Sequence, residues 1–163
     1  MRLVIFYLFL FFMQSFWGAF LAPFPAPDLF LIAVLTLAWR VQPWQLILIA
    51  YGVGLLQDIV GNGFLGLHAF GLAGGAMAAL LVRSQLSQSS FFEQSLAVLA
   101  SVAGKWLAVM PLLIWQSGSW YALRGGLAVF PIEALCTMLF ALWLLPWAKA
   151  LMERTQLLRK ELL

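Results

Sequence analysis

The chain of 163 residues is 64% hydrophobic and only 9% charged, with a formal net charge of +3. Soluble domains are about half apolar and about a quarter charged, so these side chains cannot cover the surface of a water-soluble enzyme, and a disordered segment is excluded as well. Six helices of about 20 residues would take up roughly 120 residues and leave no room for a soluble domain. We therefore expect one all-α membrane domain over residues 1–163.

Apolar segments and their interruptions predict the helices in chain order. The first segment is too long for the apolar part of a signal peptide. A long apolar stretch that follows is divided by Arg40-Val41-Gln42-Pro43 into two short helices. Residues 148–163 mix charged and apolar side chains and are expected to continue the last helix as a cytoplasmic tail. The six expected helices cover about residues 3–22, 28–41, 43–57, 64–82, 95–115 and 125–147.

The basic residues indicate the orientation of these helices. Cytoplasmic loops of membrane proteins carry an excess of Lys and Arg. With six spans and both termini in the cytoplasm, Arg124 is the only basic residue assigned to the outer side. A five-span arrangement divides the basic residues more evenly between the two sides. We therefore expect six spans, with Asp28, Asp58 and Arg124 near the outer face. The basic residues then expected on the cytoplasmic side are Arg2, Arg40, Arg83, Lys149, Arg154, Arg159 and Lys160.

The second and third expected helices are short. About 14–15 residues give ~21–22 Å of helix, whereas the hydrocarbon core is ~30 Å thick. Such helices must be shielded by their neighbours, lie beneath a thinned bilayer, or border a water-filled recess, here on the outer side.

Two charged residues fall near the bilayer centre, Lys105 in the fifth expected helix and Glu133 in the sixth. An unpaired charge at that depth costs ~2.5–3.5 kcal/mol. We expect the two to form a pair or to face a polar cavity. A pair could serve a function or only fix the register of the two helices.

Prolines and small residues mark two further candidate features. Pro111 and Pro131 lie in the outer halves of the fifth and sixth helices and suggest either an outward-facing groove for a partner helix or lipid-like ligand, or ordinary kinks. Gly71, Gly75 and Ala78 share one face of the fourth helix. Small residues let helix backbones approach closely in lipid, so this face predicts a helix contact, either internal or with another protein.

Asp58 and His68 flank the expected outer connection between the third and fourth helices. They can be read as part of a solvated turn. The sequence has no nearby nucleophile, H-E-x-x-H helix or second acid beside Asp58, which argues against a hydrolase. The single cysteine, Cys136, gives no metal-binding pattern.

The same region carries a family resemblance. The run Gly52-x-Gly54-Leu55-Leu56-Gln57-Asp58, followed by Gly61 and by Gly66-Leu67-His68-Ala69, resembles the rod shape-determining protein MreD of bacteria, and Pro27-Asp28-Leu29 is similar to the same family. The resemblance implies a non-enzymatic protein of the bacterial inner membrane without cofactors. Its implied partners are MreC and, through it, the RodA glycosyltransferase, a class B penicillin-binding protein and MreB filaments. It also implies a fold like that of the substrate-binding subunits of energy-coupling-factor transporters.

Two alternatives to this membrane scaffold stay open at the sequence level. The first is a vitamin-binding transporter subunit in which Lys105, Glu133, Asp58 and His68 line a pocket beneath the outer surface. The Ala-x-x-x-Ala face with which such subunits dock their energising module is missing from residues 6–16. The second is an intramembrane enzyme acting on lipid, for which no nucleophile–base set is apparent. We expect no nucleic-acid partner.

Overall fold

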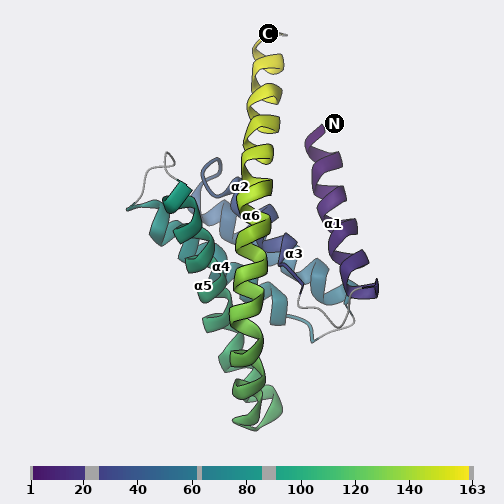
Figure 1. The fold of residues 1–163 in the computed structure, drawn as a ribbon, viewed down its shortest axis with the longest axis vertical. Helices are drawn as coiled ribbons and strands as arrows, with labels where there is room; N and C mark the ends of the chain where they lie inside the picture. Colours follow the sequence, from purple (N-terminus) through teal and green to yellow (C-terminus); the bar gives the residue numbers. More distant parts are fainter. Residues whose placement is uncertain (1, 21–25, 62–63, 86–90, 162–163) are drawn as a thin grey trace.

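The computed structural model describes residues 2–20, 26–61, 64–85 and 91–161, which form helices and contain no strand. This arrangement confirms the all-α class. The helices, drawn in Figure 1, are α1 Arg2–Phe20, α2 Leu29–Leu37, α3 Pro43–Val60, α4 Leu67–Arg83, α5 Phe91–Ser117 and α6 Tyr121–Glu161.

Three stretches are long and apolar enough to cross a membrane: Pro43–Val60, Phe92–Ser117 and Arg124–Leu151. Two further apolar helices, Val4–Gly18 and Leu67–Arg83, are shorter. By length and composition these helices indicate a membrane protein.

Several boundaries differ from those expected. The third helix is not short: α3 has 18 residues, about 27 Å, and begins at Pro43, where a missing N–H costs nothing. The fourth begins three residues late because Gly66 adopts a left-handed conformation with φ 101°. The last helix continues through the expected tail to Glu161, as predicted. The expected end of the first helix at residue 22, and the basic side chains from Arg154 onward, lie outside the described residues and side chains.

The helix α2 has nine residues, about 13 Å, so it cannot cross a bilayer. Seven of its nine residues are buried, and Leu31 and Ile32 are fully enclosed. Of the three explanations for a short helix, shielding by neighbouring helices is the one observed. The turn that ends α2 is tied to α4, because Nη1 of Arg83 donates to the carbonyl oxygens of Ala38 and Val41.

The longest helix, α6, runs along the whole molecule (Figure 1). The start of α1 and the end of α6 lie toward the same end of the structure, opposite the turn between α5 and α6.

Small residues bring α4 and α5 into close contact. A Cβ added at Gly75 would lie 2.9 Å from the carbonyl oxygen of Ser101, and one added at Gly104 would lie 2.5 Å from Cβ of Ala78. A Cβ at Gly71 would lie 2.7 Å from the side chain of Val109. The face predicted from the small residues is therefore an internal contact between α4 and α5, not a partner surface.

Candidate functional site

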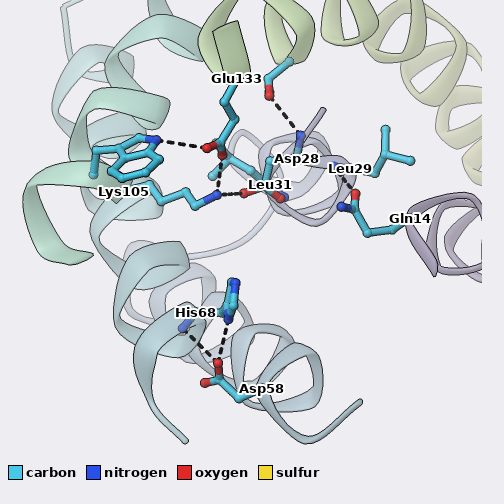
Figure 2. A network of polar contacts seen from close by, with 10 residues as sticks. Gln14, Asp28, Leu29, Leu31, Asp58, His68, Lys105 and Glu133 are labelled. Atoms are coloured by element: carbon cyan, nitrogen blue, oxygen red, sulfur yellow. Dashed lines mark hydrogen bonds and ion pairs between the residues drawn. The ribbon is translucent and has the colours of Figure 1, made fainter. Parts of the chain in front are cut away.

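The predicted pair of Lys105 and Glu133 is present, and Asp28 joins it. The ammonium Nζ of Lys105 lies 2.5 Å from Oε1 of Glu133 and 2.5 Å from Oδ2 of Asp28. Figure 2 shows the three side chains converging. All three residues are buried, with exposed fractions of 4% for Asp28 and 9% for Lys105 and Glu133. We call Asp28, Lys105 and Glu133 the buried charge cluster.

Both carboxylates of the buried charge cluster are held by further hydrogen bonds. Oε2 of Glu133 accepts from Nε1 of Trp106 at 3.1 Å. Oδ1 of Asp28 accepts from the backbone N–H of Leu31 at 2.9 Å and so caps the first turn of α2. These bonds orient each acid toward Lys105.

The backbone at the start of α2 is also tied to α6 and to α1. The backbone N–H of Asp28 donates to Oγ1 of Thr137 on α6 at 2.9 Å, and that of Leu29 donates to Oε1 of Gln14 on α1 at 2.9 Å. Polar contacts around the cluster thus join α1, α2, α5 and α6 (Figure 2).

The position of Asp28 corrects one expectation. The sequence predicts Asp28 near the outer face, whereas its ion pair sets it level with Lys105, twelve residues before the end of α5 at Ser117, about 18 Å along the helix axis. No sequence signal shows this, because a short helix can begin either at the membrane surface or inside the bundle. Sequence reasoning also missed Thr137, Trp106 and Gln14.

Two acids and one base give the buried charge cluster one excess negative charge when all three are ionised. The described residues contain no group of three or more His, Cys, Asp or Glu that could hold a metal ion. The arrangement can hold helices together.

Asp58 and His68 form a second, separate network. Asp58 is 1% exposed, so it does not belong to a solvated turn. Its Oδ2 accepts from the N–H of Gly66 at 2.7 Å, and its Oδ1 accepts from the N–H of His68 at 3.0 Å. Nδ1 of the His68 ring lies 2.7 Å from Oδ1. A carboxylate from α3 therefore caps α4, where Gly66 offers no side chain for this role.

Close packing accompanies this cap. A Cβ at Gly54 would lie 2.5 Å from the backbone oxygen of His68 and 2.6 Å from the N–H nitrogen of Ala69. The motif residues Gly54, Asp58, Gly66 and His68 thus join α3 to α4, which supports a structural role for them.

Pro111 and Pro131 are both exposed, in helices that continue past them. None of the three grooves described for this structure is lined by either proline.

An apolar groove of about 410 Å³ lies elsewhere, between α1 and α3, with α2 as its floor. In the part of the chain described, α1 packs against α2 and α6 and not against α3. We call this the α1–α3 groove. Its lining residues are Val4, Tyr7, Leu8, Leu10, Phe11, Phe30, Ala33, Val34, Leu37, Ile49, Val53 and Leu56.

Comparison of the chain with protein-family models, curated proteins and solved structures finds no match.

Proposed function

We propose that this protein is a non-enzymatic scaffold of the bacterial inner membrane that binds the transmembrane helix of MreC. In this role it helps to position RodA and a class B penicillin-binding protein for wall elongation, with MreB filaments as indirect partners. The proposal rests on the resemblance of residues 52–69 to the MreD family. The observation that carries it is the α1–α3 groove.

The α1–α3 groove has the character of a helix-binding surface. Its walls are almost entirely apolar, and it lies between two helices that do not pack on each other. In a bilayer such a groove is filled by lipid chains or by another helix. Helix association in lipid depends on close van der Waals packing, which a groove with two walls and a floor provides over more of the partner than a flat face does.

Gly52 lies beside this groove. It follows Ile49 by three residues and precedes Leu56 by four, so the three share one face of α3. A Cβ added at Gly52 would meet nothing within 4 Å, whereas one at Gly54 would collide with α4. Gly52 and Gly54 thus face different ways: Gly54 packs against α4, and Gly52 leaves space in which a partner backbone can approach.

The proposed topology has six membrane-associated helices with both termini in the cytoplasm. The common end at which α1 begins and α6 finishes supports it (Figure 1). The buried half-length α2 then contributes the floor of the groove rather than a full span.

The transporter alternative receives less support. It requires Lys105, Glu133, Asp58 and His68 to line one pocket. Lys105 and Glu133 belong to the buried charge cluster, whereas Asp58 and His68 belong to the separate network that caps α4 (Figure 2). None of the four residues lines a described groove.

Energy transfer in nanodiscs between this protein and a MreC-like protein, both full-length, tests the proposal. Gly52→Leu should weaken the association about tenfold, equivalent to about 1.4 kcal/mol, because bulk on the contact face prevents close packing. The matched control is Gly125→Leu, at another exposed glycine with nothing within 4 Å of an added Cβ. Both variants should melt like the wild type. If the wild-type protein does not associate with the MreC-like protein, the scaffold function is wrong. If both variants bind it equally well, the α1–α3 groove is not the binding site.

A further inference from the structure

A second groove, of about 630 Å³, lies between α2, α5 and α6 at the end of the molecule where α2 finishes. We call it the basic pocket, since among its described lining residues two carry a positive charge and none a negative one. Its lining residues are Leu35, Thr36, Trp39, Arg40, Gln94, Leu145, Pro146, Ala148, Lys149 and Ala150.

The two cations of the basic pocket are free to bind a ligand. Arg40 and Lys149 are both exposed, and among the described residues neither side chain makes a hydrogen bond or ion pair. Arg83, at the same end of α2, differs: its guanidinium already donates to the carbonyl oxygens of Ala38 and Val41. Glu93, the neighbouring acid on α5, is not among the lining residues.

The rest of the lining separates into a polar and an apolar part. Gln94 offers an amide beside the cations. The hydroxyl of Thr36 is already satisfied, because it donates to the carbonyl oxygen of Ala33 and lies 2.8 Å from the Tyr7 hydroxyl. Leu35 and Leu145 give an apolar wall deeper in the bundle. A ligand with an anionic head and an apolar continuation matches this division.

Tryptophans place the basic pocket at the level of lipid headgroups. Trp39 lines it, and Trp143 and Trp147, on either side of its residues Leu145 and Pro146, are 60% and 68% exposed. Tryptophan side chains concentrate at the membrane–water interface.

We propose that the basic pocket binds a phosphate group, supplied in the membrane by the headgroup of an anionic phospholipid, with Arg40 and Lys149 on the phosphate. This assignment does not depend on the proposed scaffold function. The cations that favour a cytoplasmic orientation are normally spread along loops. Here Arg40, in the turn after α2, and Lys149, on α6, line one cavity, and no acid is among its described lining residues.

Native mass spectrometry of the full-length protein, titrated with phosphatidylglycerol or phosphatidylcholine, tests the proposal. The wild type should retain one phosphatidylglycerol per chain and bind phosphatidylcholine more weakly. Arg40→Gln and Lys149→Gln should each lower the affinity for phosphatidylglycerol about fivefold, and the double variant about 25-fold. Ala150→Trp, which fills the pocket at an exposed position without changing any charge, should also lower it.

Two comparisons separate this site from general attraction to basic residues. Arg124→Gln removes one positive charge at the opposite end of α6 and should leave phosphatidylglycerol binding unchanged. Displacement of the lipid by millimolar inorganic phosphate would support a phosphate-binding site. It would identify the ligand as a soluble phosphate and overturn its assignment to a lipid headgroup. Equal retention of phosphatidylglycerol by the wild type and the Arg40→Gln/Lys149→Gln double variant, with both folded by circular dichroism, would overturn the proposal.

Discussion

The ammonium group of Lys105, in the middle of α5, lies 2.5 Å from the carboxylate of Asp28, which caps α2 77 residues earlier in the chain. One ion pair therefore fixes where a nine-residue helix begins inside the bundle. Because Glu133 holds the same ammonium from α6, the start of α2 is tied at once to both long helices.

The charges of the buried cluster predict an asymmetry between single substitutions. Lys105→Leu leaves two acids facing each other without a cation and should cost about 3–5 kcal/mol of stability. Glu133→Gln leaves the neutral pair of Asp28 and Lys105. Its single amide oxygen can accept from Lys105 or from Trp106 but not from both, so this change should cost about 1–2 kcal/mol. Thermal unfolding in detergent measures both.

A rescue experiment provides the control. Asp28→Asn and Glu133→Gln, added together to Lys105→Leu, remove both acids while an Asn oxygen can still cap α2. This triple variant should be more stable than Lys105→Leu alone. Equal losses for Lys105→Leu and Glu133→Gln would contradict the charge argument.

The cap on α4 gives a second prediction. Asp58→Ala removes the acceptor for the backbone N–H groups of Gly66, His68 and Ala69 and should cost about 3 kcal/mol, since each buried donor left without a partner is unfavourable. His68→Ala removes only the bond from the ring and should cost about 1 kcal/mol. A melting temperature for Asp58→Ala equal to that of the wild type would show that the cap does not stabilise the fold.

The contact between α4 and α5 gives a third prediction. Gly75→Leu places side-chain atoms against the carbonyl oxygen of Ser101 and the side chain of Leu31, so it should destabilise the protein by about 1–3 kcal/mol or more. Leu81→Ile, at a position 65% exposed on the same helix, should have little effect. If Gly75→Leu weakens partner binding, it should also lower the melting temperature of the protein. Weaker binding by a variant that melts like the wild type would show that a partner contacts this face of α4.

Topology gives a fourth prediction. In a Cys136→Ser background, an impermeant maleimide added to spheroplasts should label Ser117→Cys, at the end of α5, and not Gln85→Cys, just beyond α4. Permeabilised membranes should label both. Labelling of Gln85→Cys in sealed spheroplasts would refute the six-helix arrangement with cytoplasmic termini.

The sequence predicted the helical class, the order of the helices and the break at Pro43, because apolar length and proline chemistry are local properties. It predicted the continuation of the last helix beyond Trp147 from the mixture of charged and apolar side chains there. It also predicted the pair of Lys105 and Glu133, since a charge deep in a membrane helix has few acceptable surroundings.

Only the tertiary structure decided which faces meet. In a soluble protein the pattern of polar and apolar residues distinguishes the buried face of a helix from its exposed face. In lipid both faces are apolar. The sequence of α4 therefore could not show whether Gly75 contacts another helix of the same chain or a partner protein. For the same reason Asp28 could not be assigned to Lys105: its depth depends on the burial of all of α2 beneath its neighbours, a consequence of packing between segments far apart in the chain.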